Sequence, residues 1–216
     1  MNTPTEVPAW AWTWASQRLQ TQISSATRVE SNEANQVFRV ECDAGRFFLK
    51  IGPRLQNEHE RLRWLEGRLL CPRPLGFIAH GEEDAFLTSA VEGDGLASLS
   101  VTLPAPTIIA RLAAALMAVH AVNTADWPFG GIGPVLVHGD ACLPNFLYQG
   151  DHLSGCIDVG DMAVGAPAVD LAAAVWSLQY NLGRGHGLAL LREYGVMDAD
   201  EEKVERLRRN YEADCP

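Results

Sequence analysis

Three polar side chains in the middle of the chain have the types and the spacing that phosphoryl transfer requires. Asp140 precedes Asn145 by five residues, and Asp158 follows thirteen residues later, each beside a short apolar run that could hold it rigidly. A carboxylate next to an incoming hydroxyl accepts its proton. An amide oxygen and a second carboxylate can face a divalent cation, which neutralises phosphate charge. The segment 135–161 therefore predicts a phosphoryl-transfer site.

Each of these residues also has a simpler structural interpretation. Asp and Gly are favoured in turns, so a His-Gly-Asp sequence is more often a turn than a catalyst. Asp158 could cap a strand end, and Asn145 could form an Asx turn. The ordered series favours chemistry, because protein kinases place a catalytic Asp, an Asn five residues later and a metal-binding Asp before a glycine. Here that glycine is Gly160, two residues after Asp158.

A cation for nucleotide phosphates is predicted at Lys50, which ends the apolar run RFFLK. From the rim of a strand its ammonium could reach the α- and β-phosphates. Glu58 lies eight residues later on the inward face of an amphipathic helix, and we expect it to pair with Lys50. Glu60 and Glu66 are the competing acids of that helix. Taken singly, a lysine at a strand end and acids on a charged helix are usually only solvated.

Apolar periodicity predicts the elements that must position these side chains. A short helix is expected at about 10–20. The runs that follow predict two strands joined by a tight turn at Asp43-Ala44-Gly45, then a helix and a second hairpin. The expected ranges are 37–42, 46–51, 54–69, 75–79 and 85–91.

The pattern changes after residues 92–95, whose two glycines and two acids suit a connector. A helix buried on one face is expected at 106–122. Short apolar runs and long helical patterns then alternate, at 134–137, 145–148, 153–157, 168–182 and 199–213. A mainly helical second part of the chain is therefore predicted.

Composition excludes several classes of protein. The chain has 216 residues, 47% of them hydrophobic, and a formal net charge of −10. This charge argues against nucleic acid and anionic membranes as partners and suits a cationic partner, although acidity also serves solubility. The longest apolar stretch, 108–122, is interrupted by Arg111 and too short to span a bilayer. Five scattered cysteines and an N-terminus without a secretory pattern favour a reduced, cytoplasmic chain.

The motifs HGDACLPN (138–145), IDVGD (157–161) and AVDLA (168–172) resemble the aminoglycoside phosphotransferase family, and most closely its 3'-hydroxyl-type kinases. The N-terminal runs RFFLKI and FLTSAVEG extend the resemblance over roughly residues 20–200. It implies an α+β, protein-kinase-like two-lobe fold, with a small N-terminal antiparallel sheet plus a helix and a mainly helical C-terminal lobe. Residues 1–92 would form the nucleotide-binding lobe and residues 93–216 the catalytic and acceptor-binding lobe.

The resemblance also implies roles for individual residues. Asp140 would orient the acceptor hydroxyl and take its proton, while Asn145 and Asp158 would hold Mg²⁺ against the phosphates of ATP. His138 would organise the catalytic loop. Asp170 would brace that loop or cap the following helix.

Further roles concern the nucleotide. The hinge that reads adenine through backbone groups would be formed by Ser89, Ala90 and Val91. The phosphate-covering loop at 28–38 contains no glycine, so Ser31, Asn32 and Asn35 would have to contact the phosphates instead. His120 is expected to be a packed, hydrogen-bonded core histidine.

One departure from the family concerns the acceptor. Only about fifteen residues separate Val122 from His138, where the family usually carries an additional helical segment that walls the antibiotic pocket. A more open acceptor site is expected, for an aminoglycoside, an amino sugar or a similar small molecule. Four acids are available to a cationic acceptor and also fit a solvated surface: Asp126, Asp161, Glu212 and Asp214.

The residues and the resemblance together favour an ATP- and Mg²⁺-dependent kinase that phosphorylates a small-molecule hydroxyl. A catalytically silent, kinase-like binding protein is the alternative, favoured by the glycine-free loop and the short acceptor region. A metal-dependent hydrolase using Asp140, Asp158 and His138 is a third hypothesis, but it has no role for Lys50 or Glu58.

Overall fold

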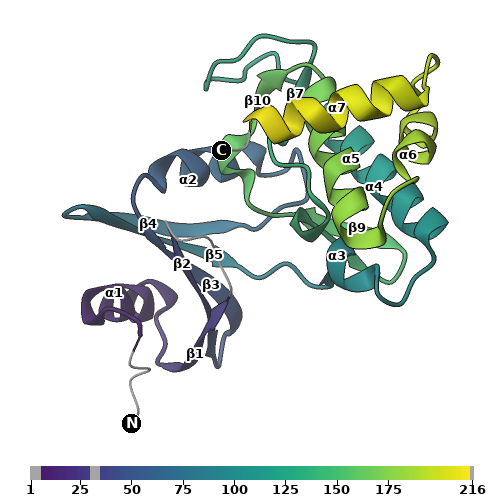
Figure 1. The fold of residues 1–216 in the computed structure, drawn as a ribbon. Coiled ribbons are helices and arrows are strands. Elements are labelled where there is room, and N and C mark those ends of the chain that lie inside the picture. The colour runs from purple at the N-terminus through teal and green to yellow at the C-terminus, as the bar shows by residue number, and fades with distance from the viewer. Residues whose placement is uncertain (1–5, 30–34, 215–216) are drawn as a thin grey trace. The chain divides into compact units, whose positions relative to one another are not determined.

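The computed structural model describes residues 6–29 and 35–214. The chain divides into two compact units, one of residues 1–63 and 72–90 (unit 1) and one of residues 64–71 and 91–216 (unit 2). Unit 1 contains an antiparallel sheet with helices, and unit 2 is mainly helical (Figure 1). The α+β class expected from the sequence is confirmed. The separate nucleotide-binding and acceptor-binding roles given to 1–92 and 93–216 stay a prediction.

The sheet of unit 1 has five antiparallel strands in the order β1-β2-β3-β5-β4. Four strands match the predicted runs, but three strands, not two, precede the helix. The sequence missed the edge strand β1, because only Ile23 of its seven residues is buried and no alternation of apolar residues marks it. The strands are β1 (Ile23–Val29), β2 (Gln36–Cys42), β3 (Gly45–Gly52), β4 (Pro74–His80) and β5 (Glu83–Ser89).

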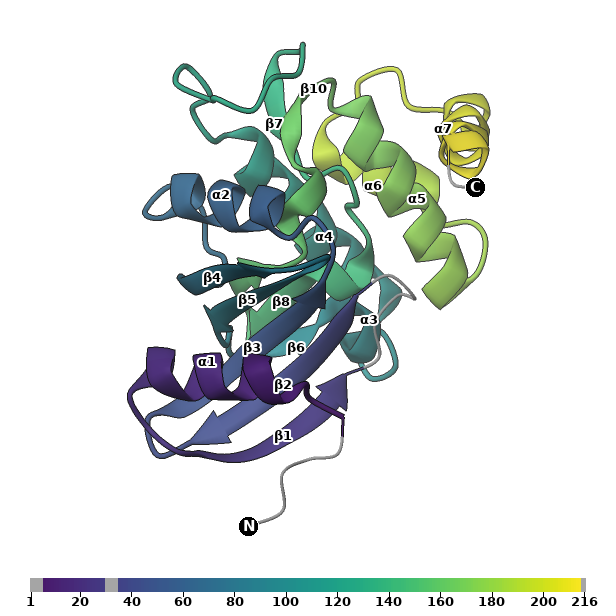
Figure 2. The same ribbon diagram turned by 90° about the vertical axis from the view of Figure 1, so that its left-hand side faces the viewer.

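Two helices cover opposite faces of this sheet (Figure 2). Helix α1 (Ala9–Leu19) packs its small residues Ala11 and Ala15 into one core cluster with alternate residues of the strands, such as Leu49. Successive side chains of a strand point to opposite faces, so Lys50 lies on the other face, with helix α2 (Gln56–Leu65). The helix expected at 54–69 ends earlier because turn residues follow Leu65, among them Gly67 with a φ of +75°.

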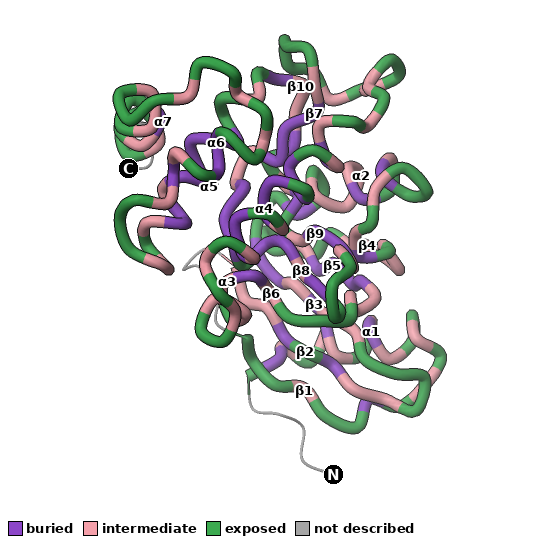
Figure 3. Tube along the Cα trace, turned by 90° about the vertical axis from the view of Figure 1, so that its right-hand side faces the viewer, coloured by how far each residue is buried: buried purple, intermediate pink, exposed green. Residues whose placement is uncertain are grey.

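Unit 2 is built around two long helices that were both predicted, α4 (Ala105–His120) and α5 (Ala168–Leu182). Their inward faces are buried, whereas helix α7 (Glu201–Asp214) is exposed along most of its length (Figure 3). Helix α6 (Gly187–Tyr194) was missed, since eight residues give too few turns for a periodic signal. None of the helices in the described part of the chain is long and apolar enough to cross a membrane.

Short strands of unit 2 carry the loops that contain the motif residues. A three-stranded sheet has the order β6-β8-β9, and a two-stranded sheet pairs β7 with β10. The bounds of the remaining elements are α3 (Leu96–Leu99), β6 (Asp94–Gly95), β7 (Val135–Val137), β8 (Phe146–Gln149), β9 (His152–Cys156) and β10 (Ala163–Gly165), with 3₁₀ turns η1 (Leu143–Asn145) and η2 (Val159–Asp161).

Replacement of Leu116, which is fully buried in α4, tests the core of unit 2. We expect Leu116→Ala to lower the free energy of unfolding by about 2–5 kcal/mol, because it leaves a cavity. The neighbouring Met117 is 45% exposed, and Met117→Ala should change it by less than about 0.5 kcal/mol. Urea titration followed by circular dichroism measures both, and equal losses would contradict the assignment of the buried face.

Candidate active site

Asp140 and Asn145 are joined by hydrogen bonds within one tight loop. The loop begins after Val137, the last residue of β7, and leads through the 3₁₀ turn η1 into β8. The Asn145 side-chain amide donates both to the Asp140 carbonyl oxygen and to Asp140 Oδ2, each at 2.9 Å. The five-residue spacing therefore closes the loop and orients the Asp140 carboxylate from one side.

Gly139 occupies a position that only glycine tolerates. Its φ is +86°, and a Cβ atom there would lie 2.6 Å from the carbonyl oxygen of Asp161. Both the backbone conformation and the close approach exclude a side chain. The glycine of the His-Gly-Asp sequence thus allows the loop to pass directly against the segment that contains η2.

A buried carboxylate, Asp170 at the start of α5, holds the beginning of this loop. Its two oxygens accept hydrogen bonds from the backbone N–H groups of His138 at 2.8 Å and Gly139 at 3.0 Å. His120 Nε2 lies 2.9 Å from the same carboxylate, and His120 Nδ1 lies 2.7 Å from the Tyr194 hydroxyl. Of the two roles expected for Asp170, the structure shows the brace. His120 is a packed, hydrogen-bonded core histidine, as expected.

Asp158 is tied to the same loop through the residue before it. The Ile157 N–H donates to the Asn145 carbonyl oxygen at 2.9 Å, and His138 Nε2 donates to the Ile157 carbonyl oxygen at 3.0 Å. Asp158 itself has a φ of +57°, a left-handed conformation that is uncommon for a residue with a side chain. Such strain persists where the surroundings impose it, and it is frequent at functional sites.

His138 lies inside the loop, and both of its ring nitrogens contact backbone groups. It is fully buried, and its Nδ1 accepts the Asp140 N–H at 3.4 Å. Together with the Nε2 contact to Ile157, this corresponds to the tautomer with its proton on Nε2. The geometry thus agrees with a residue that organises the loop, and its part in catalysis stays a prediction.

The oxygen atoms of Asn145 and Asp158 form a donor set that fits a hard cation. The Asn145 Nδ2 group is engaged by Asp140, which leaves Oδ1 as the side-chain atom for a cation. Among the described residues, no group of three or more His, Cys, Asp or Glu side chains could hold a metal. Proteins bind Mg²⁺ through one or two carboxylates together with water and substrate phosphates, and its binding by Asn145 and Asp158 stays a prediction.

In unit 1, Lys50 and Glu58 form the expected ion pair. Lys50 Nζ donates to Glu58 Oε2 at 2.7 Å, and the two side chains are only 17% and 12% exposed. The competing acid Glu60 instead accepts a hydrogen bond from Gln56 on the same helix. The alternation of strand β3 and the first turn of α2 together bring the pair to one face of the sheet. Nucleotide binding by these residues stays a prediction.

The first two residues of the expected adenine-reading hinge, Ser89 and Ala90, make backbone contacts of their own. The Ser89 N–H donates to the Arg73 carbonyl oxygen at 2.9 Å, and the Ala90 N–H donates to the Arg46 carbonyl oxygen at 3.3 Å. The Ser89 hydroxyl also accepts from the Arg73 N–H. These N–H groups are thus engaged within unit 1, and the reading of adenine by residues 89–91 stays a prediction.

The phosphate-covering loop is only partly described. Ser31 and Asn32 lie outside the described residues. Asn35 is described, immediately before β2, and is half-buried. The contact of these three residues with phosphates stays a prediction.

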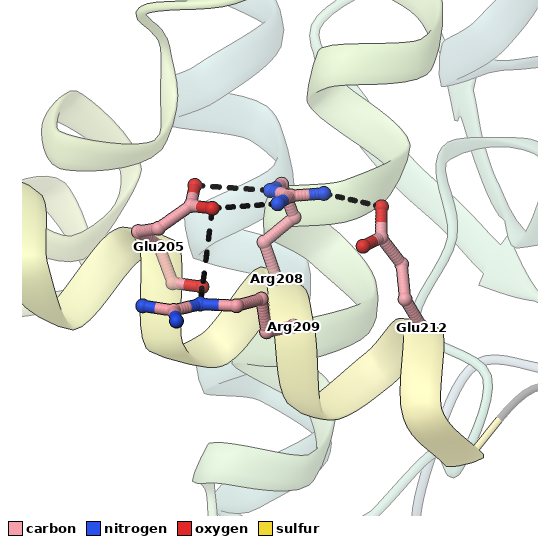
Figure 4. Close-up of polar contacts among 4 residues, drawn as sticks. All are labelled: Glu205, Arg208, Arg209 and Glu212. Carbon is pink, nitrogen blue, oxygen red and sulfur yellow. Dashed lines mark hydrogen bonds and ion pairs between the residues drawn. The ribbon is translucent and has the colours of Figure 1, made fainter.

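Two of the four acids considered for a cationic acceptor are engaged elsewhere. Asp126 pairs with Arg68 at 2.8 Å, and Asp161 is exposed. Glu212 accepts a hydrogen bond from Arg208, which also bonds Glu205 (Figure 4). Asp214 belongs to α7, and its side chain is outside the description.

The network on α7 neutralises its own carboxylates. Arg208 lies between Glu205 and Glu212, and Arg209 lies 3.8 Å from Glu205 (Figure 4). The hydrogen bond from Arg208 lowers the pKa of Glu205. These pairs favour the solvated-surface interpretation of the tail acids over a binding role.

One residue at the site was missed by the sequence reasoning. The Tyr211 hydroxyl, from α7, donates to Asp140 Oδ1 at 3.3 Å and lies 3.5 Å from Cys142 Sγ. A helix was predicted at 199–213, but nothing in a linear pattern indicates which of its residues meets a loop seventy positions earlier.

The brace at Asp170 can be tested by its amide. In Asp170→Asn an amide NH₂ group replaces one of the two carboxylate oxygens and faces a backbone N–H donor. We therefore expect the free energy of unfolding to fall by about 2–4 kcal/mol. Asp151→Asn is the matched control, because Asp151 is 92% exposed and pairs with Arg111 at the surface. Its effect should stay below about 1 kcal/mol by urea titration, and comparable effects of the two variants would contradict the brace.

Comparison with known proteins identifies the family of the chain. The sequence model of the phosphotransferase enzyme family matches residues 25–135 and 127–207. An aminoglycoside 3'-phosphotransferase from Niallia circulans is 27% identical over 73% of this chain and 79% of that protein. A second one, from Escherichia coli, is 23% identical over 78% of this chain and 82% of that protein.

Solved structures share the fold. The aminoglycoside phosphotransferase APH(3'')-Id from Streptomyces rimosus superposes with a TM-score of 0.72 at 19% identity, over 93% of this chain and 96% of that chain. These findings confirm the fold and the resemblance inferred from the motifs. Because the family model covers most of its length, the chain belongs to the phosphotransferase enzyme family.

Proposed function

We propose that this chain transfers the γ-phosphoryl group of ATP to a hydroxyl of an aminoglycoside or a related amino-sugar-like compound. The observation that carries the proposal is that Asn145 bonds the Asp140 carboxylate and also accepts the N–H of Ile157, the residue before Asp158. The two curated relatives are named as aminoglycoside 3'-phosphotransferases, which supports the acceptor class. One similar solved structure is a complex of APH(3'')-Id with ADP and streptomycin, which supports nucleotide binding.

In this proposal Asp140 orients the acceptor hydroxyl and accepts its proton as the oxygen attacks the γ-phosphorus. The hydrogen bond from Asn145 to Oδ2 keeps the carboxylate in one orientation. Phosphoryl transfer demands little covalent chemistry from the protein, so positioning of this kind supplies much of the acceleration.

Asn145 and Asp158 hold Mg²⁺ through oxygen atoms. Mg²⁺, when bound, neutralises the charge of the nucleotide phosphates. Lys50, kept in place by Glu58, contacts the α- and β-phosphates. The left-handed backbone at Asp158 and the bonds of Ile157 keep the carboxylate in position.

A catalytically silent binding protein is a less economical proposal. Each polar residue that the reaction requires is present, and in both units these side chains are paired in the manner the reaction needs. A hydrolase that uses Asp140 and Asp158 leaves the buried Lys50–Glu58 pair without a role.

The four described cysteines are free, which supports a reducing compartment such as the cytoplasm.

Replacement of the proposed base tests the reaction itself. We expect Asp140→Asn to lower kcat by about 10²–10⁴-fold, because the amide cannot accept the proton. ADP production is measured across a panel of aminoglycosides and amino sugars, and the Kd for ATP should stay within about twofold, since Asp140 does not hold the nucleotide. Asp151→Asn is the control. Retained phosphorylation in Asp140→Asn would refute the role of Asp140.

Replacement of a proposed metal ligand tests the cofactor. In isothermal titration with ATP, the wild-type affinity should rise when Mg²⁺ is present. Asp158→Asn should weaken binding of Mg²⁺-ATP by at least about tenfold, while the weaker binding of ATP alone persists. An unchanged affinity for Mg²⁺-ATP would refute the metal role, and a wild type that binds no nucleotide would favour the silent protein.

A further inference from the structure

We propose that the hydroxyl of Tyr211 is a positioning group of the phosphoryl-transfer site, which holds the Asp140 carboxylate in the orientation that receives the acceptor proton. The inference rests on the proposed function and adds a residue from the C-terminal helix to that site. Tyr211 lies near the end of α7, seventy-one positions after Asp140 in the sequence.

The two oxygens of the Asp140 carboxylate have donors from different elements. Asn145 Nδ2 donates to Oδ2 at 2.9 Å from within the loop, and the Tyr211 hydroxyl donates to Oδ1 at 3.3 Å from α7. Two donors on opposite oxygens oppose rotation of the carboxylate about its χ2 bond. Each carboxylate oxygen can accept more than one hydrogen bond, so an acceptor hydroxyl can still donate to Asp140.

Cys142 lies beside the Tyr211 hydroxyl on the same loop as Asp140. Its Sγ is 3.5 Å from the Tyr211 hydroxyl oxygen, and either atom can be the donor of that contact. A carboxylate oxygen only accepts, so in the contact with Asp140 Oδ1 the phenol O–H is the donor. The Tyr211 hydroxyl thus contacts two residues of the loop.

Ring packing holds Tyr211 in place independently of its hydroxyl. The Tyr211 ring lies 5.3 Å from the Trp176 ring on α5, and Trp176 also stacks on Tyr180, at 5.3 Å. The next residue of α5, Ser177, accepts the Leu143 N–H at 2.9 Å, which fastens the same helix to the catalytic loop. Helix α5 thus connects Tyr211 to the loop, and removal of the hydroxyl leaves this packing intact.

The contact is better suited to orientation than to stability. Its 3.3 Å separation is longer than the usual range for O–H···O bonds, so its loss should cost little folding free energy. The rate should depend strongly on the orientation of the Asp140 carboxylate, because the base has to meet a hydroxyl that is in line with the γ-phosphorus. Small misplacements of reacting groups lower the rate of a reaction by large factors.

Tyr211→Phe tests the inference, because phenylalanine keeps the ring and removes the hydroxyl. We expect kcat to fall about tenfold or more, with the KM for ATP within about twofold and the melting temperature nearly unchanged. Tyr180→Phe is the matched control, since its ring stacks on the same indole and its side chain is 76% exposed. This control should keep the wild-type kcat.

Two outcomes would overturn the inference. One is a Tyr211→Phe variant with the wild-type kcat. The other is a fall in kcat that is matched by a fall in the folded fraction, which would make Tyr211 merely structural. A Tyr211→Phe change that has no further effect on kcat in an Asp140→Asn background would support it, since residues that act as a unit are not additive.

A separate measurement distinguishes failure of the inference from failure of the proposed function. A wild-type chain that phosphorylates nothing in the acceptor panel would overturn the proposed function. The side-chain carboxyl ¹³C resonance of Asp140, compared between the wild type and Tyr211→Phe, then decides the contact. A shifted resonance shows that the hydroxyl of Tyr211 bonds the carboxylate, whereas an unchanged resonance overturns the inference whatever the activity.

Discussion

The candidate site depends on one buried ion, the carboxylate of Asp170. A fully buried carboxylate is strongly unfavourable unless hydrogen bonds replace its lost hydration. Two backbone N–H groups and His120 supply them. The backbone N–H groups of His138 and Gly139, in turn, need a hydrogen-bond acceptor, and Asp170 is that acceptor. The start of the catalytic loop is thereby tied to helix α5, which belongs to the core of unit 2.

The other contacts of the loop connect to the residues that Asp170 holds. His138 reaches the carbonyl oxygen of Ile157, and Asn145 engages both Asp140 and the N–H of Ile157. Asp140 and Ile157, the residue before Asp158, are thus both bonded to the same two residues, His138 and Asn145. Loops that carry function are commonly positioned by a rigid scaffold. Here that scaffold is helix α5, which bonds the loop through Asp170 and Ser177.

The Lys50–Glu58 pair arises from a different constraint, the alternation of a strand. Leu49 and Ile51 are buried against α1, so Lys50 must project from the opposite face of the sheet, where α2 lies. Phe86, paired with Lys50 in the neighbouring strand, contacts His59 of α2 on that same face. An ammonium among such neighbours needs a carboxylate, and Glu58 in the first turn of α2 supplies it.

Local patterns in the sequence determined most of the strands and long helices, the order of the motif residues and the Lys50–Glu58 pair. They did so because burial alternates with the period of each element and because the motif spacings close short loops. The edge strand β1 has one buried residue and gave no such signal. Only the tertiary structure decided that Tyr211 meets Asp140 and that Asp170 binds two N–H groups instead of capping its helix. Which face of α7 packs on α5 depends on contacts between residues far apart in the chain, and no local periodicity encodes those distances.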